Sequence, residues 1–568
     1  MRNRKFVPAL TGLALTGLLA LSACGSGASS GGNVQNNEQL ASKTTDINPQ
    51  DPANLTDGHF VWPLDDYLPN WNGNEVDGND ENDVPVYSAM LPRLFLVQPD
   101  GTSKVNPDYL TSATVTSTSP QVITYEFNPK AHWTDGKPLS WQDLKAQWQA
   151  MNGADPAFQT ASTSGYADIA SVTQGKSATE AVVTFSQPYA EWQGLFAHFS
   201  PLYPQSVNAT PDSFNSSLAN GPTEASAGPF KLGSFDKNNG TITLVRNPDW
   251  WGAKPVLSQI IFQVVSRDNR ADALQNNEIS LAPLGASADL YRRAQAMSNV
   301  TIHTAVAANF NDVWFDGKTG KLLSDQKLRV AVAKGINSVS FTKAAVGSYI
   351  TNPVPIGNHI YTPGSKYHED HSSILAYDPA EAGKEMDADG WTLAPGAKYR
   401  TKNGAELDLS ILDNSDASDS LDKEQNTLLI NQLAAIGIKA TVNLVPSAQF
   451  ATLEDKFNWD LQMNGWLVSP FPISRTAGHY TLNGDNPSNY EQIGNATINN
   501  LYAQANGTLD DTARAKLGNE IDTQLWQEAI DVPLFQSPGV VITNKYLANM
   551  GAFGFSDADY TRIGFVKH

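Results

Sequence analysis

A single cysteine, Cys24, constrains this 568-residue chain more than any other feature. With one thiol the chain can form no internal disulfide and no site that needs several cysteines to hold a metal. Cytosolic proteins usually contain several thiols, whereas exported proteins pair them or avoid them, so the count favours export. Stability must then come from a packed core, and the roughly 500 residues beyond Cys24 are enough for two or more domains.

The residues before Cys24 have the layout of a secretory leader. A basic end precedes an apolar run over 6–20, which is too short for a stable membrane span. Residues 21–24, Leu-Ser-Ala-Cys, resemble a bacterial lipobox, in which the cysteine is lipidated and becomes the first mature residue. We predict a lipoprotein signal peptide at 1–23 and a lipid anchor at Cys24 on the extracytoplasmic side of the cell membrane. An ordinary signal peptide is the alternative.

The segment after Cys24 is rich in glycine, serine and other polar residues. Such a composition cannot bury apolar surface, so 24–50 is predicted to be a flexible tether. No other stretch approaches 18 consecutive apolar residues, so no further membrane span is expected.

The charge of the chain excludes one class of partner. The net charge is −20, and it becomes −23 when Arg2, Arg4 and Lys5 leave with the signal peptide. A field of this sign repels phosphate backbones, so no nucleic-acid partner is expected. The densest acidic run, 77–83, alternates oxygen-bearing residues as a calcium loop does, but no glutamate closes it at the twelfth position. We predict a solvated surface loop there.

Local patterns place helices and strands in alternation. Strands are predicted at 122–127, 241–245, 438–444 and from 459 into 464–466, and helices from Ser140, from Asp378 to Gly390 and over 421–436. Ser140 opens a capping box, and Pro379 stands at the first turn of its helix. The fold class is therefore α/β, in the sense of mixed α+β.

Several short motifs follow one another in a fixed order over more than 350 residues. They are His132-Trp133-Thr134-Asp135-Gly136-Lys137-Pro138-Leu139-Ser140, Ala227-Gly228-Pro229-Phe230-Lys231-Leu232, Arg246-Asn247-Pro248-Asp249-Trp250-Trp251, 328–337, Tyr377-Asp378-Pro379 with Gly390-Trp391, 436–438, and Asp460-Leu461 with Gly465-Trp466. In this order they resemble the family 5 (dipeptide and oligopeptide) solute-binding proteins of bacterial ABC importers. The resemblance runs from about Asp57 to the C-terminus. We assign Trp133, Asp135, Gly136 and Pro138 to folding rather than to binding.

The resemblance implies a two-lobed, periplasmic-binding-protein-like fold with an extra inserted domain. Lobe I is expected at 51–85, 226–304 and 536–568, the inserted domain at 86–225, and lobe II at 305–535. A solute, with oligopeptide favoured, would be trapped between the lobes by hinge closure. The membrane subunits of an ABC permease would then receive it. The resemblance also implies a monomer.

The candidate ligand-binding residues are those of one strand end and the turn after it. They are Asn464, Gly465, Trp466, Leu467, Val468 and Ser469. In relatives this strand end pairs with an extended peptide as an added strand does. Peptide-binding relatives carry an aspartate three residues after the tryptophan, and it neutralises the α-amino group of the ligand. Here Ser469 stands in that place, and Asp485, Asp65 or Asp66 is a possible substitute.

Three rival functions remain open at this point. An oligosaccharide could stack on tryptophan, which the neutral Ser469 favours. A secreted hydrolase could use a carboxylate pair such as Asp65 and Asp66, but the chain has no G-x-S-x-G or H-E-x-x-H motif. An adhesive surface protein would usually be repetitive, and this chain is not. The histidines that lie closest in sequence are His359, His368 and His371, and their spacing is not that of a metal site, so we expect no bound metal. We also expect that the protein is not an enzyme and needs no cofactor.

Overall fold

The computed structural model describes residues 35–36, 44–66, 68–80, 84–197, 200–283, 288–348, 350–351, 353–415, 420–482 and 489–567. The predicted signal peptide, the predicted lipobox with Cys24 and the first part of the predicted tether lie outside the described residues. Helices and strands interleave along the rest of the chain, which confirms the mixed α and β class.

The first sheet joins segments that are distant in sequence. Its order is β11 (Phe230–Asp236), β12 (Thr241–Arg246), β13 (Gln259–Val264) and β4 (Val61–Leu64). The predicted strand at 241–245 is β12, and Ile242 and Leu244 on its inner face are fully buried. The C-terminal end of the chain forms β23 (Leu547–Ala548) and β25 (Gly564–Val566), and β25 pairs with both β23 and β3 (Leu55–Thr56).

A second, antiparallel sheet lies within the predicted inserted domain. Its order is β7 (Leu110–Thr118), β8 (Gln121–Phe127), β10 (Glu180–Phe185) and β9 (Ile169–Gln174). The predicted alternation of β8 is confirmed, because Ile123, Tyr125 and Phe127 are buried. Helix α3 (Trp141–Met151) packs on β9, and its predicted capping box is formed between Ser140 and Asp143.

The W-T-D-G-K-P motif forms the turn that the sequence predicts. His132 and Pro138 form a β-bridge, and Gly136 takes a φ of +82°, which glycine adopts without strain. Trp133 is buried, and its indole N–H donates to the carboxylate of Asp143 at 3.2 Å. The motif therefore anchors α3 to the core.

The third sheet is the largest and carries the predicted site strand. Its order is β14 (Leu281–Pro283), β22 (Asp531–Asn544), β15 (Val300–Phe315), β21 (Leu461–Leu467), β19 (Asp408–Asn414) and β20 (Lys439–Val445). The predicted strand at 438–444 is β20, the edge strand of the sheet, and Leu444 on it is 48% exposed.

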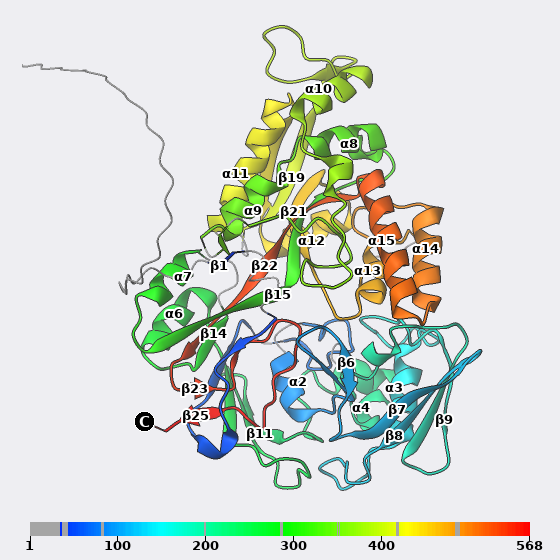
Figure 1. The fold of residues 1–568 in the computed structure, drawn as a ribbon, viewed down its shortest axis with the longest axis vertical. Coiled ribbons are helices and arrows are strands. Elements are labelled where there is room, and N and C mark those ends of the chain that lie inside the picture. The colour runs from blue at the N-terminus through cyan, green and yellow to red at the C-terminus, as the bar shows by residue number, and fades with distance from the viewer. Residues whose placement is uncertain are drawn as a thin grey trace, which may run out of the picture. The chain divides into compact units, whose positions relative to one another are not determined.

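Two long strands of this sheet, β15 and β22, run side by side through much of the molecule (Figure 1). The predicted domain boundaries at 304/305 and 535/536 fall inside these two strands rather than in loops. The pairing between them shifts register between Val306 and Phe310, which marks a β-bulge.

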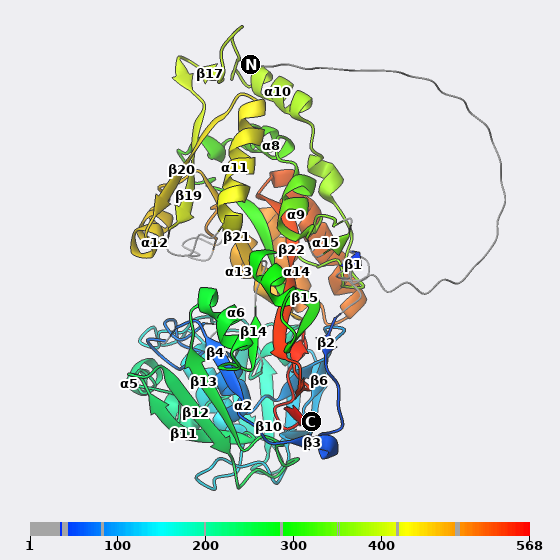
Figure 2. The same ribbon diagram turned by 90° about the vertical axis from the view of Figure 1, so that its left-hand side faces the viewer.

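Helices cover this third sheet, and Figure 2 shows α8, α9 and α11 gathered beside β19, β20 and β21. They are α8 (Gln326–Lys334), α9 (Ser338–Val346), α10 (Pro379–Ala388), α11 (Ser420–Ala435), α12 (Ser447–Asp455), α13 (Pro472–Tyr480), α14 (Ala496–Gly507) and α15 (Asp511–Glu528). The predicted helix ends are confirmed at Asp378, which caps α10, and at Gly390, whose φ is +91°.

Buried apolar side chains form separate hydrophobic clusters. One large cluster takes its residues from 60–281 and 547–563, and a second takes them from 306–535. The remaining short elements include α2 (Val84–Met90), α4 (Gln205–Asn208) and α5 (Pro211–Ser216) in the first cluster's region, and α6 (Arg267–Gln275) and α7 (Ala288–Gln295) beside β14.

The predicted tether is too long. Its last residues form β2 (Asp46–Ile47), which pairs with β24 (Gly551–Ala552), and Asp46 accepts a hydrogen bond from the Thr304 backbone N–H at 2.7 Å. The polar composition of this segment concealed the pairing, because backbone hydrogen bonds need no apolar side chains. Among the described residues, no helix is long and apolar enough to cross a membrane.

Candidate ligand-binding site

The six predicted site residues lie together at the end of β21 and in the turn that leads into α13. Asn464, Gly465, Trp466 and Leu467 belong to the strand, and Val468 and Ser469 follow it. Trp466, Val468 and Ser469 are buried, whereas Asn464, Gly465 and Leu467 are partly exposed.

The second half of β21 has a strand partner on one side only among the described residues. β15 pairs with all of β21, from Leu461 to Leu467, but β19 pairs only with Leu461 and Gln462. The backbone N–H of Gly465 turns away from β15 and donates to the side chain of Asn464 at 2.9 Å. The carbonyl of Leu467 accepts from Arg475 at 3.2 Å. Residues 463–467 therefore form an edge without a second strand, where side chains meet two of the backbone groups and an added strand could take their place.

Gly465 also has a structural reason to be glycine. A Cβ atom built there would lie 2.3 Å from the carbonyl oxygen of Phe310 on β15, a contact that real Cβ atoms do not make. The absent side chain lets the two strands approach, so the glycine is accounted for by packing as well as by its position in the site.

Trp466 belongs to a column of stacked rings. It lies 4.6 Å from Trp314 and 3.4 Å from His479, and Trp314 in turn stacks on Tyr490 at 5.7 Å, all measured between ring centroids. Both faces of the Trp466 indole are covered, and its side chain is 9% exposed. The column fixes the end of β21 against β15 and leaves no open tryptophan face.

Two buried carboxyl groups lie beside this column. Asp312 on β15 stands directly opposite Asn464 in the strand pairing, and Glu491 follows Tyr490. Burial raises the pKa of Asp312 well above its usual range, and Asp531 and Glu491 raise it further. Burial and Asp531 raise the pKa of Glu491 in the same way.

The residues predicted to substitute for an aspartate at the position of Ser469 differ in their surroundings. Ser469 uses its hydroxyl to accept a hydrogen bond from the Phe471 N–H at 2.9 Å, which shapes the turn before α13. Asp65 is held by Arg267 and Arg270; burial alone would raise its pKa, but the two guanidiniums lower it. Asp66 also interacts with neighbouring groups, and Asp485 lies outside the described residues.

A contact between the 188–194 segment and α13 reaches the site from another part of the chain. Glu191 accepts hydrogen bonds from the backbone N–H of Ile473 at 3.2 Å and from the N–H and hydroxyl of Ser474 at 2.7 and 2.5 Å. Phe471, the residue before α13, supplies no side-chain cap, so Glu191 caps this helix from 280 residues away. Burial raises the pKa of Glu191, and the hydrogen bonds from Ser474 oppose the rise.

The histidine group of the sequence forms a hydrogen-bonded network. His359 Nδ1 lies 2.6 Å from Asp522 and its Nε2 lies 3.1 Å from Asp531, and His371 Nδ1 lies 2.6 Å from the other oxygen of Asp522. Burial opposes protonation, but Asp531 and Asp522 raise the pKa of His359 to about 9. His368 bonds instead to the carbonyl of Ile356 at 2.7 Å. The described residues contain no cluster suited to hold a metal ion.

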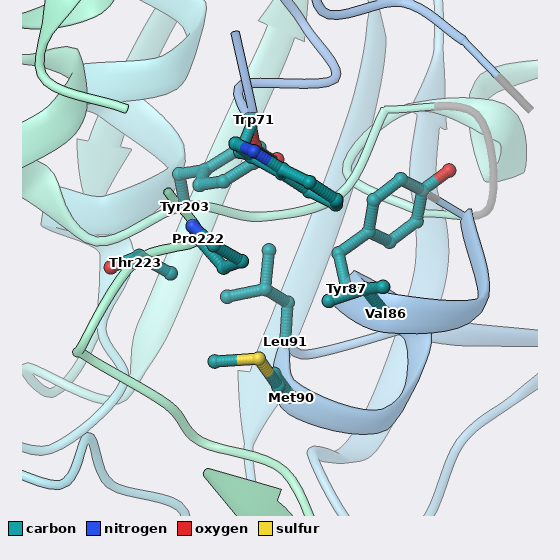
Figure 3. A pocket seen from close by; sticks show the side chains of 8 residues that line it. All are labelled: Trp71, Val86, Tyr87, Met90, Leu91, Tyr203, Pro222 and Thr223. Carbon is teal, nitrogen blue, oxygen red and sulfur yellow. Dashed lines mark hydrogen bonds between the residues drawn. The ribbon is translucent and has the colours of Figure 1, made fainter. Parts of the chain in front are cut away.

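One small pocket lies outside this region, between α2 and the loop at Trp71. Figure 3 shows Trp71 above and Leu91 below its centre, with Tyr87 and Pro222 on opposite sides. It contains about 230 Å³ of space, part of it open to solvent. Ligand pockets usually enclose about 300–1,000 Å³, so this one suits a single apolar side chain rather than a whole solute.

Sequence reasoning missed Glu191, Asp312 and Glu491. Glu191 gave no signal, because its partners lie 280 residues away. Asp312 could have been noticed as a lone acid within the apolar strand Phe310-Asn311-Asp312-Val313-Trp314.

Comparisons with known proteins place the chain in a class. It is similar to the periplasmic EDTA-binding protein EppA, with a TM-score of 0.84, 24% identity and coverage of 93% of this chain and 99% of that one. It is also similar to the oligopeptide-binding protein AppA from Bacillus subtilis, solved with a nonapeptide, with a TM-score of 0.75, 17% identity and coverage of 90% and 100%. The fold is that of a periplasmic binding protein.

The family follows from sequence. Residues 104–488 match the family model described as bacterial extracellular solute-binding proteins, family 5, middle part. The chain is 38% identical over 528 residues to the oligopeptide-binding protein OppA of Mycobacterium tuberculosis, covering 92% of this chain and 88% of that protein. The chain belongs to the family 5 bacterial extracellular solute-binding proteins.

Proposed function

We propose that this protein is the extracytoplasmic receptor of an ABC importer and that it captures oligopeptides. The one-sided pairing of β21 carries the proposal. An extended peptide could form backbone hydrogen bonds along residues 463–467, as an added strand does, whatever its side chains. The relative with 38% identity over nearly the whole chain is named for oligopeptide binding, which supports this ligand class.

The peptide would be enclosed between two lobes, lobe I with its inserted domain and lobe II, and the closed form would be recognised by the permease. We assign the hinge to β15 and β22, the two continuous strands in which the expected boundaries fall. The bulge after Val306 interrupts their ladder, and the side chains of Asn309 and Asn311 both donate to the Ser537 hydroxyl there, at 3.2 and 2.9 Å. A ladder that is already interrupted can bend with little loss of hydrogen bonding.

The receptor would act as a monomer held at the membrane by a lipid on Cys24. The basic, apolar and Leu-Ser-Ala-Cys order of the first residues supports this anchor. Two acyl chains are enough for stable attachment, at about 0.8 kcal/mol for each buried methylene group.

The rival ligand and the rival activity have weaker support. A sugar needs an open tryptophan face, and both faces of Trp466 are covered. A hydrolase that used Asp65 and Asp66 would need one carboxyl with a raised pKa as the acid, but the pKa of Asp65 is lowered by Arg267 and Arg270. We infer that binding and delivery, rather than turnover, are the protein's role.

Isothermal titration of the mature protein with mixed tetra- and pentapeptides, and separately with β-glucan oligomers, tests the ligand class. Peptides should bind and glucans should not. Mass spectrometry of whatever co-purifies with the protein should find peptides. Binding of glucans without any binding of peptides would overturn the proposal.

A further inference from the structure

Asp312 and Glu491 are buried carboxyl groups that lack partners. Both residues are fully buried. Neither carboxyl oxygen of either group has a hydrogen-bond partner among the described residues. Burial of an ionised carboxylate without a partner is strongly unfavourable. Such groups must therefore either stay protonated or meet a cation.

The protein supplies no free cation to them within the described residues. The nearby His359 is already occupied, since it lies between Asp522 and Asp531, at 2.6 and 3.1 Å. The hydroxyl of Tyr480 donates to the second oxygen of Asp531 at 3.0 Å. Asp531 thus has one hydrogen bond, from Tyr480, and an imidazole nitrogen close to its other oxygen, whereas no hydrogen bond reaches the carboxyl oxygens of Asp312 or Glu491 among the described residues.

The two carboxyl groups lie beside the strand along which a peptide would pair. Trp314 lies two residues after Asp312 on the same face of β15, and its ring stacks with Trp466 and Tyr490. Because these rings cover one another, recognition of an ammonium or guanidinium group would rest on the carboxylates, which form charge-assisted hydrogen bonds with such cations. Asp312 is also the direct cross-strand neighbour of Asn464, so the site adjoins the strand on which a peptide would lie.

We propose that Asp312 and Glu491 receive a positively charged group of the bound peptide, either its terminal ammonium or a basic side chain. This inference rests on the proposed function. Asp312 and Glu491 would then take the role that the resemblance gives to an aspartate at the position of Ser469. The inference also predicts that the protein prefers peptides with a cationic group near one end.

A proton should leave when such a peptide binds. The groups that face Asp312 are Asp531, Glu491 and Tyr480, with His359 beyond Asp531, and the two acids and burial keep the pKa of Asp312 high in the free protein. A bound cation favours the ionised carboxylate and lowers that pKa. Between the two values binding releases a proton, and the affinity rises with pH.

The first experiment uses the unaltered protein. Titration of one peptide in phosphate and in Tris buffer at the same pH gives the number of protons released from the difference in heat. A peptide with a free terminus should release a proton, and its N-acetylated form without basic residues should release none. An N-acetylated peptide with one lysine separates the two sources of the cation, because it releases a proton only if a basic side chain can occupy the site.

The second experiment uses Asp312→Asn and Glu491→Gln, with Asp389→Asn as the matched control. Asp389 makes a partly buried ion pair with Lys402 at 2.8 Å and lies on a different part of the chain. Each site variant should bind the cationic peptide about tenfold or more weakly, with little change for the acetylated neutral peptide. A thermal unfolding scan shows whether each variant folds.

Equal affinity of the unaltered protein for cationic and neutral peptides, with no proton release, would overturn the inference. Peptide binding as such would then still stand, so this failure is distinct from failure of the proposed function. If neither kind of peptide bound, both would fail.

Discussion

Replacing Glu191 by alanine removes a contact that joins the 188–194 segment to the start of α13. Its carboxylate accepts three hydrogen bonds, two of them from backbone N–H groups of Ile473 and Ser474. Phe471, at the N-cap position of this helix, forms no side-chain cap of its own. Around it, the Ala190 N–H donates to the carbonyl of Asn506 at 2.7 Å, so the segment also touches α14.

The free energy that Glu191→Ala removes from this contact follows from the three hydrogen bonds. A helix N-cap contributes about 1 kcal/mol, and each buried donor left without an acceptor costs about 1–3 kcal/mol. We expect Glu191→Ala to weaken the contact by about 2 kcal/mol, since water can reach part of the vacated space. If the contact forms only when the lobes close, this changes the ratio of closed to open protein by about 30-fold.

The shift between closed and open protein can be measured in two ways. Calorimetry gives the peptide affinity, and small-angle X-ray scattering gives the radius of gyration. Glu191→Ala should bind peptide about 30-fold more weakly and be more extended without ligand. Ser474→Ala, which keeps both backbone bonds, should show a smaller effect, and Glu126→Ala, at an exposed position of β8, should show none. Unchanged affinity and unchanged scattering in a folded Glu191→Ala protein would refute the role of this contact in closure.

Three further changes have defined outcomes. Gly465→Ala should destabilise the protein by about 1–3 kcal/mol in denaturant unfolding, because its Cβ meets the Phe310 carbonyl, whereas Gly478→Ala on α13, where a Cβ meets nothing within 4 Å, should cost nothing. His359 has a folded pKa of about 9, above its unfolded value of 6.5, so its stabilisation is present below pH 6.5 and is lost as the pH rises through 9. It amounts to at most about 3 kcal/mol, and His359→Gln should flatten the fall of the thermal midpoint between pH 7 and 9.5; an equally steep fall in the variant would count against it. Cys24→Ser should move the protein from the membrane fraction to the soluble fraction, and retention at the membrane would argue against the lipid anchor.

The sequence was most informative where neighbouring residues decide the structure. The alternation of β8, the capping box at Ser140 and the proline start of α10 all involve residues within a few positions of one another. These signals gave the class, most element positions and, with the order of motifs, the family. The strand end at 464–467 was located instead through the family resemblance.

Features that depend on distant partners could not be predicted. β2 pairs with a strand about 500 residues away, and nothing in its polar composition indicates that pairing. The expected boundaries at 304/305 and 535/536 have no turn signal, because each falls within a single long strand.

The distances along the chain connect ligand pairing to the Glu191 contact. Leu467, the last residue of β21, and Ile473, which donates to Glu191, are six positions apart, and Arg475 of α13 donates back to the Leu467 carbonyl. A peptide that orders the backbone at 465–467 therefore also fixes the start of α13, where the carboxylate of Glu191 accepts its hydrogen bonds. Because the two contacts share one short rigid segment, a ligand need not touch residues 188–194 to favour their closure. This predicts that the affinity losses from Gly465→Ala and Glu191→Ala are not additive, which a double-mutant cycle measures.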